Sequence, residues 1–206
     1  MTKIKNIVFD LGGVIMNLDV PKTIKAFKEI GIDNIVNNTG HAYQHPFFYE
    51  LEVGKISEDE FLESLFNLSD QEPTHQQITE AWNKMILDMP KERIDFLHNL
   101  KTKYNLFLLS NTNSIHQKKY LDDFKADYQT SFNEMFKKTY YSHEIGIRKP
   151  DAEVFNFILN DSNLKAEETL FVDDALSNIE AAQNLGIETY HVQNYNVVGV
   201  LDFLKK

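Results

Sequence analysis

The stretch Ile7-Val8-Phe9-Asp10-Leu11-Gly12-Gly13 decides the fold of this 206-residue chain. Its three leading apolar residues end at an aspartate, and two glycines follow closely. A short apolar run bounded by a turn signal predicts a buried strand of a parallel sheet. Asp10 would then lie at the carboxyl end of the strand, where open α/β sheets bind ligands, and the glycines would let the backbone turn sharply. Alternatively, Asp10 only caps a loop, and one strand cannot decide between the two.

Three later stretches place further polar side chains next to predicted elements. The run Phe107 to Leu109 predicts a second buried strand, and Ser110-Asn111-Thr112 follows it. Arg148-Lys149-Pro150 is a basic pair directly before a predicted helix. The run Leu170 to Val172 predicts another strand, which ends in Asp173-Asp174. In chain order, the four elements supply an aspartate, a serine, a lysine and an acidic pair.

With these four elements in this order, the chain resembles the haloacid dehalogenase superfamily. Members of that superfamily have an aspartate nucleophile after a first strand, a Ser or Thr after a second, a Lys, and then an acidic pair. The stretches Asp10 to Ile15, Ile145 to Pro150 and Phe171 to Asp174 are most similar to sugar-phosphate phosphatases like α-D-glucose-1-phosphate phosphatase. Each motif is weak alone, whereas four in order over nearly the whole chain are specific.

The fold class predicted is α/β, a Rossmann-like doubly wound parallel sheet, because strands and helices alternate along the second half of the chain. We expect strands at 106–109, 138–141, 169–172 and 188–192, and helices after Pro90 and Ser114 and at 151–160, 176–185 and 198–204. Residues 16–88 contribute only helices, at 22–30, 58–67 and 78–89, so they predict an inserted helical lobe. Ser57 with Glu60 and Thr74 with Gln77 are capping boxes for the last two.

The resemblance adds a domain division and a strand order to this prediction. It implies that residues 16–88 form a helical cap domain over the site and that residues 1–15 and 89–206 form the core domain. It also implies that the first and fourth strands are neighbours, which would bring Asp10, Asp173 and Asp174 together.

Three adjacent carboxylates predict a divalent cation, because unpaired buried carboxylates repel one another and are costly to desolvate. The sequence has no cysteine and no arranged histidines, so Mg²⁺ is favoured over zinc. The resemblance implies the ligands: Asp10, the backbone carbonyl of Gly12, Asp174, and Asp173 directly or through water. Capping of the next helix by Asp173 and Asp174 is the alternative, and it is compatible with metal binding.

The resemblance also implies the roles of the reacting groups. Asp10 would attack phosphorus to form an aspartyl phosphate, which water then hydrolyses. Ser110 and the backbone N–H of Asn111 would bind phosphoryl oxygens, and Lys149 would supply a compact positive charge. Without the motif order, Lys149 would be interpreted as a surface lysine. Asn178 is a candidate for orienting Lys149, with a plain surface asparagine as the alternative.

Gly12 departs from the pattern of the superfamily. Most of its phosphatases have a second aspartate at this position, which protonates the leaving oxygen and later activates water. The glucose-1-phosphate phosphatases share the glycine, so activity is not excluded. Substrate alcohol groups, water or a cap residue such as His45 could take over the proton transfer, whose loss costs about 10²–10⁴ in rate.

Residues 47–52 of the helical insertion are predicted to lie nearest the site, and they combine aromatic side chains with a glutamate. Phe47 and Glu52 are the candidate substrate-binding residues there, because aromatic faces and a carboxylate suit a sugar ring. Phe48, Tyr49 and Trp82 lie in the same lobe, and packing of all these aromatic rings within it is the alternative.

Composition narrows the function classes. The chain is 42% hydrophobic, which suffices for a sizeable core, and its formal net charge is −10. Phosphate-backbone binding needs a basic face, so a nucleic-acid partner is not expected. No apolar run is long enough to span a bilayer, and the amino terminus lacks a signal-like region. We therefore expect a cytoplasmic protein, a monomer or weak homo-oligomer, whose partner is a small phosphate ester.

The interpretation that fits these features best is a Mg²⁺-dependent phosphatase acting on a small phosphomonoester such as a sugar phosphate. One alternative is a dehalogenase that uses Asp10 against carbon, a chemistry that needs no metal. The other is a non-catalytic phosphate-metabolite binding protein that lost turnover together with its second aspartate.

Overall fold

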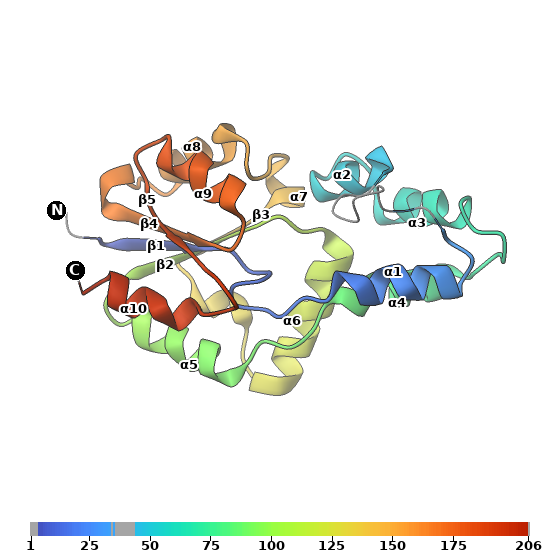
Figure 1. Ribbon diagram of the computed structural model, residues 1–206, viewed down its shortest axis with the longest axis horizontal. Coiled ribbons are helices and arrows are strands. Elements are labelled where there is room, and N and C mark those ends of the chain that lie inside the picture. Colours follow the sequence, from blue (N-terminus) through green and yellow to red (C-terminus); the bar gives the residue numbers. More distant parts are fainter. Residues whose placement is uncertain (1–3, 34, 36–43, 206) are drawn as a thin grey trace.

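The computed structural model describes residues 4–33, 35 and 44–205, and its centre is a parallel sheet of five strands in the order β3-β2-β1-β4-β5 (Figure 1). The strands are β1 (Asn6–Phe9), β2 (Asn105–Ser110), β3 (Lys138–Tyr141), β4 (Thr169–Asp173) and β5 (Glu188–His191). The predicted α/β fold class is therefore confirmed, including the neighbouring first and fourth strands.

Alternate residues of the strands fill two separate cores, one on each face of the sheet. Ile7 and Phe9 of β1 belong to one core, and Val8 belongs to the other. The helices α5 (Lys91–Leu100), α6 (Ser114–Tyr128) and α10 (Val200–Phe203) cover the first face, while α8 (Ala152–Asp161) and α9 (Leu176–Gln183) cover the second (Figure 1). Burial on both faces explains why the strands are continuous apolar runs in the sequence.

Four helices lie beyond the carboxyl ends of the central strands and form what we call the helical lobe (Figure 1). They are α1 (Val20–Glu29), α2 (Pro46–Glu52), α3 (Glu58–Phe66) and α4 (His75–Trp82). Both predicted capping boxes are present, at Ser57 with Glu60 and at Thr74 with Gln77. No helix in the described part of the chain is long and apolar enough to cross a bilayer.

Several helix boundaries differ from the prediction, among them the end of α4 and the start of α6. The helix expected at 78–89 ends at Trp82, and after a short 3-10 turn the chain runs extended beside the segment that leaves β1. Leu87 N–H donates to the Asn17 carbonyl at 3.1 Å, and Asn17 N–H donates to the Asp88 carbonyl at 2.9 Å. The spacing of apolar residues could not show this pairing between distant segments. The paired backbone groups of residues 87 and 88 are not available for the hydrogen bonds of a longer helix. The cap of α6 is Asn113, which accepts from His116 N–H, and Ser114 is the first helical residue.

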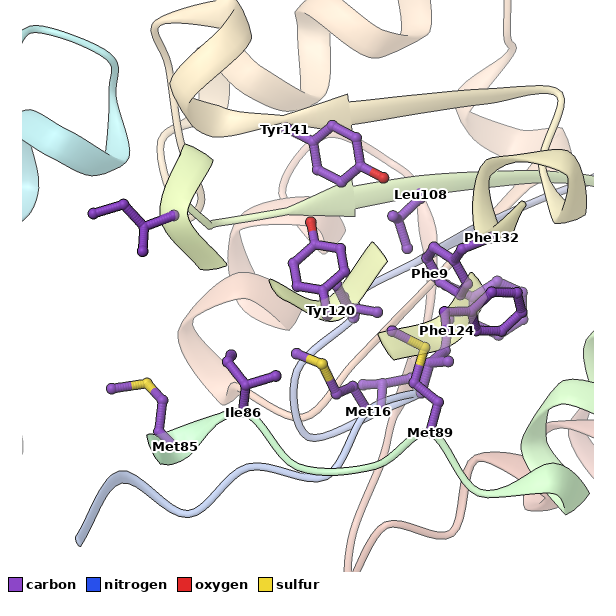
Figure 2. Close-up of a cluster of buried hydrophobic side chains, with 14 of the residues drawn as sticks. Phe9, Met16, Met85, Ile86, Met89, Leu108, Tyr120, Phe124, Phe132 and Tyr141 are labelled. Carbon is purple, nitrogen blue, oxygen red and sulfur yellow. The ribbon is translucent and has the colours of Figure 1, made fainter. Parts of the chain in front are cut away.

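The two extended connections are anchored in the first core. Met16, Ile86 and Met89 point toward α6, where Tyr120 and Phe124 are buried (Figure 2). Apolar residues on both connections therefore fix the base of the helical lobe against the sheet and the helices that cover it, which together we call the sheet domain.

Trp82 joins the helical lobe to α6 through its ring and its carbonyl. Its ring stacks on that of His116 with centroids 4.4 Å apart. Its carbonyl accepts from Thr23 Oγ1 at 2.9 Å and lies 3.1 Å from His116 Nε2. His116 Nδ1 lies 3.2 Å from Asn113 Nδ2, so this network assigns the neutral tautomer with the proton on Nε2. Burial lowers the pKa of His116 to about 4.

This buried histidine predicts a pH dependence of stability. The unfolded chain binds a proton on His116 below about pH 6.5, whereas the folded chain excludes it down to about pH 4, so the stabilisation is complete above pH 6.5 and is lost toward pH 4. The full effect is about 3 kcal/mol, or roughly 5–10 °C in Tm.

Melting curves of wild type and His116→Gln between pH 4.5 and 7.5 test this prediction. The variant remains neutral and keeps a donor for Trp82, so its Tm deficit should shrink as the pH falls. His98→Gln, on the exposed side of α5, is the matched control. A pH-independent difference between wild type and His116→Gln would contradict the assignment.

Candidate active site

Asp10, Asp173 and Asp174 meet at the carboxyl ends of β1 and β4. Phe9 is paired with Val172, and Asp10 N–H donates to the Val172 carbonyl at 2.9 Å, so the next residues of both strands lie side by side. Each of the three aspartates offers an oxygen atom, and these atoms lie within 4.8 Å of one another. The sheet order therefore brings together the three carboxylates that the sequence predicted as metal ligands.

Lys149 lies between two of these carboxylates. Its side chain is only 1% exposed, and its Nζ lies 2.5 Å from Asp10 Oδ1 and 2.8 Å from Asp173 Oδ2. Burial opposes the charge of the ammonium, but Asp10 and Asp173 outweigh it and raise the pKa of Lys149. The lysine is thus a buried cation, which the sequence could distinguish from a surface lysine only through the order of the motifs.

Asp173 is also held by Asn178 and by the backbone just before α9. Asn178 Nδ2 lies 3.1 Å and 3.0 Å from its two carboxylate oxygens, and Ala175 N–H donates to Oδ1 at 2.7 Å. Asn178 is buried, so it is not a plain surface residue. It reaches Lys149 through Asp173 and not by a direct hydrogen bond, which refines the predicted role.

The charges of the cluster do not balance among its own residues. Three carboxylates face a single ammonium, and burial, together with the neighbouring aspartates, raises the pKa of Asp10 to about 7 despite Lys149. Burial and Asp173 raise the pKa of Asp174 as well. A hard divalent cation with oxygen ligands would remove this repulsion, so the donor set fits Mg²⁺.

The loop after β1 packs directly against Asp174. Gly13 has φ +77°, and a Cβ on it would lie 2.1 Å from Asp174 Oδ2, so only glycine fits there. Gly12 differs, because its backbone is outside the left-handed region. A Cβ on Gly12 would lie 2.5 Å from Leu18 Cδ1, the end of a flexible side chain. Leu18 therefore occupies the space that a side chain at position 12 would take.

Ser110 ends β2, and Asn111 is the first residue after the strand. Ser110 is the last residue of the strand and is 3% exposed. The Asn111 side chain forms two hydrogen bonds with the backbone of Lys149: Nδ2 donates to its carbonyl at 2.9 Å, and Oδ1 accepts from its N–H at 3.0 Å. The sequence pointed only to the backbone N–H of Asn111, so this side-chain clamp was missed.

The two predicted substrate residues of the helical lobe are both engaged by protein groups. Phe47 lies within an aromatic cluster: its ring centroid is 4.7 Å from that of Phe48 and 5.7 Å from that of Phe61. The Glu52 carboxylate forms an ion pair with Arg148 Nη1. Burial raises the pKa of Glu52, although Arg148 opposes the shift. Contact of either residue with a substrate stays a prediction.

Open space borders Asp174 and Gly13. A pocket of about 530 Å³ is lined by Gly13, Asp174 and the loop after β5, with His191, Gln193, Asn194 and Tyr195. The larger cavity of about 660 Å³ lies between α5 and α10, away from the three aspartates. The candidate site is therefore identified by its cluster of carboxylates and not by the volume of the cavity beside it.

Two residues that support the site were given no role in it by the sequence. Ser142 Oγ accepts from Thr112 N–H at 2.9 Å and donates to its carbonyl at 3.0 Å, which fixes the turn after β2. Arg148 bridges Glu52 and the Lys149 carbonyl. Ser142 has no recognisable signal in the sequence, and Arg148 was noted only as part of the basic pair with Lys149, because the partners of both residues are distant along the chain.

Comparison with known proteins agrees with this geometry. The chain is 36% identical over 191 residues to the D-ribitol-5-phosphate phosphatase of Bacteroides thetaiotaomicron, which covers 93% of each protein. A haloacid dehalogenase family enzyme of the same organism superimposes with a TM-score of 0.90 at 35% identity, covering 98% of this chain and 99% of that one. Another structure of that enzyme, an Asp-to-Ala variant, was solved with magnesium and inorganic phosphate, with a TM-score of 0.87, 35% identity and coverage of 92% and 94%.

A further solved structure, a predicted HAD-like family hydrolase of Porphyromonas gingivalis, has a TM-score of 0.87 and 33% identity over the full length of both chains. The family model described as haloacid dehalogenase-like hydrolase matches residues 4–186. This match includes all four motifs, from Asp10 to Asp174. The chain belongs to the haloacid dehalogenase-like hydrolase family.

Proposed function

We propose that this protein is a Mg²⁺-dependent phosphatase that hydrolyses a small phosphorylated sugar or sugar alcohol through an aspartyl phosphate on Asp10. The observation that carries the proposal is the buried ammonium of Lys149 between Asp10 and Asp173, with Asp174 beside them. A buried cation next to an anionic nucleophile suits a phosphate dianion, whose charge must be compensated as it approaches a carboxylate.

Asp10 is the proposed nucleophile. One of its carboxylate oxygens forms a bond to phosphorus while the bond between phosphorus and the ester oxygen breaks. Water then attacks phosphorus in the aspartyl phosphate, which releases phosphate and regenerates the carboxylate. Lys149 favours the ionised form of Asp10 and compensates the charge of the phosphoryl group.

The end of β2 supplies neutral donors for the same group. The Ser110 hydroxyl and the backbone N–H of Asn111 are proposed to bind phosphoryl oxygens. The hydrogen bonds between the Asn111 side chain and Lys149 keep the two motifs in register.

Magnesium is the cofactor that the family and the magnesium-containing relative indicate. The proposed ligands are Asp10, Asp174 and the Gly12 carbonyl, with Asp173 directly or through water. Bound there, Mg²⁺ would neutralise charge on the phosphoryl oxygens. Asp173 already accepts from Lys149, Ala175 and Asn178, which favours the contact through water.

The helical lobe is the proposed cap domain, formed by residues 16–88 over a core of residues 1–15 and 89–206. Phe47 and Glu52 of α2 are proposed to contact the carbon chain of the substrate, and the ion pair of Glu52 with Arg148 shows that this end of α2 lies near Lys149. The relative named as a D-ribitol-5-phosphate phosphatase acts on the phosphate of an open-chain sugar alcohol. Phosphorylated sugar alcohols are therefore proposed as substrates in addition to cyclic sugar phosphates.

The dehalogenase and the non-catalytic alternatives have less support. A dehalogenase needs no metal, whereas three adjacent carboxylates favour one. A binding protein without turnover would not need a nucleophile kept between Lys149 and a metal site. The 36% identity to a phosphatase over 93% of the chain also favours catalysis.

A screen of phosphorylated sugars and sugar alcohols, with Mg²⁺ or with chelator, tests the proposed function. Wild type should release phosphate from at least one substrate only with Mg²⁺. Asp10→Asn and Asp174→Ala should lose turnover by about 10³-fold or more, because they remove the nucleophile and a metal ligand. Metal-independent turnover, or a folded Asp10→Asn protein with substantial activity, would refute the mechanism.

The glycine at position 12 predicts an unusual dependence on the leaving group. With Leu18 where a carboxylic acid would stand, the leaving oxygen takes its proton from water, so rates should fall steeply as the leaving alcohol becomes less acidic. Anomeric phosphates should therefore be better substrates than 6-phosphates of the same sugar, and aryl phosphates better still if they fit.

The variant Gly12→Asp combined with Leu18→Ala tests this from the other side. The backbone accepts aspartate at position 12 once Leu18 is shortened, so the double variant should accelerate poor leaving groups more than good ones. Leu18→Ala alone is the control. A flat series in wild type would mean that another residue donates the proton.

The charge imbalance predicts a metal effect on stability. A carboxyl group whose pKa is raised in the folded state favours folding when protonated, so the metal-free protein should lose stability as the pH rises from about 4 through about 7. In chelator at pH 8, Asp10→Asn should melt above wild type by a few degrees, since each kcal/mol is worth roughly 2–4 °C.

Saturating Mg²⁺ should raise the Tm of wild type more than that of Asp10→Asn. Asp95→Asn on α5, which removes an exposed carboxylate, is the control and should respond to Mg²⁺ like wild type. Equal Mg²⁺ shifts in wild type and Asp10→Asn would exclude Asp10 as a ligand.

A further inference from the structure

Arg148 connects the helical lobe to the backbone of Lys149. Its Nη1 forms an ion pair with Glu52 at the end of α2, and its Nε donates to the Lys149 carbonyl at 3.2 Å. The guanidinium also lies over the ring of Tyr49, 5.8 Å from the centroid. One side chain therefore touches two residues of α2 and the peptide unit of the buried lysine.

The contact between α2 and the sheet domain is tight around this arginine. Just past α2, Gly54 has φ +66°, and a Cβ on it would lie 2.2 Å from the carbonyl oxygen of His143. His143 lies in α7 (Ser142–Ile145), five residues before Arg148. The backbone of the lobe thus comes close to the segment that leads to Lys149, and the ion pair lies beside this approach.

The Lys149 carbonyl has two side-chain donors, Arg148 Nε and Asn111 Nδ2. The Asn111 side chain also accepts from Lys149 N–H. Asn111 belongs to the sheet domain whatever the position of the lobe. Arg148 is different, because its guanidinium is oriented by Glu52 and Tyr49, and both of these belong to the lobe.

We propose that Arg148 is a positioning residue that couples the closed position of the helical lobe to the placement of Lys149. When α2 lies against the sheet domain, Glu52 and Tyr49 hold the guanidinium so that its Nε supports the Lys149 peptide. The Lys149 side chain is then kept between Asp10 and Asp173. The kinetic part of this inference rests on the proposed function, since it takes Lys149 as a phosphate-binding group.

The first test measures amide hydrogen exchange and needs no substrate. The probe is Lys149 N–H, which donates to Asn111 Oδ1 at 3.0 Å. Its exchange should accelerate in Arg148→Met and also in Glu52→Gln, although residue 52 is far from it in the sequence. Asp59→Asn on the exposed side of α3 is the matched charge control and should leave the exchange unchanged. An unaltered Lys149 amide in Glu52→Gln would overturn the coupling.

The second test separates ion pairing from support of Lys149. The exchanged pair Glu52→Arg with Arg148→Glu can restore attraction between the lobe and the sheet domain, but glutamate has no N–H to donate to the Lys149 carbonyl. Relative to Glu52→Arg alone, which lacks the same substrate contact, the exchanged pair should recover KM, while its kcat stays about tenfold or more below that of wild type, because misplacing a catalytic group is costly. Recovery of both constants would make Arg148 a simple ion-pair partner and would refute the positioning role.

The two tests show separately whether the coupling through Arg148 fails and whether the proposed phosphatase function fails. If wild type shows no phosphatase activity, the proposed function fails, and the exchange of the Lys149 amide still decides whether the lobe and Lys149 are coupled. If wild type is active and the variants keep its kcat and KM, only the coupling fails.

Discussion

The rest of the structure depends on one electrostatic constraint: a buried ammonium must be kept among three carboxylates that repel one another. Lys149 Nζ lies 2.5 Å from Asp10 and 2.8 Å from Asp173. A buried charge is tolerated only when it is paired and hydrogen-bonded. The sheet order supplies the carboxylates, Asn178 and Ala175 N–H complete the shell of Asp173, and Asn111 fixes the backbone of Lys149. A cation at Asp174 would complete the charge balance.

The sequence could locate the candidate residues of this site because the signals for them are local. A buried parallel strand is an apolar run, and the reactive residue follows where the run stops, so Asp10, Ser110 and Asp173 could be located before their neighbours were known. The turn after the first strand was also a local signal for Gly13, and the structure adds a reason from a distant segment, since Asp174 leaves no room for a side chain there. Bringing the motifs together required the strand order, which came from the resemblance and which the sheet confirms.

The parts that could not be predicted depend on contacts between distant segments. The helix expected at 78–89 stops at Trp82 because the following residues pair with the outgoing connection at Asn17. Glu52 was proposed to bind substrate because its stretch combines aromatic rings with a carboxylate, but the sequence could not show its ion pair with Arg148. Nothing in the sequence indicated that Leu18 lies against position 12 or that His116 is buried against Trp82, because both contacts form only when the helical lobe packs on the sheet domain.

The central claim is that Asp10 becomes phosphorylated during turnover, and trapping this intermediate tests it most directly. Wild type would be mixed with Mg²⁺ and a substrate carrying a radiolabelled phosphoryl group, quenched in acid within the first turnover, and digested for peptide mapping. The account predicts an acid-stable, hydroxylamine-sensitive label on the peptide that contains Asp10, and none in Asp10→Asn. Rapid release of labelled phosphate, with kinetics that require an intermediate but no label on Asp10, would contradict it.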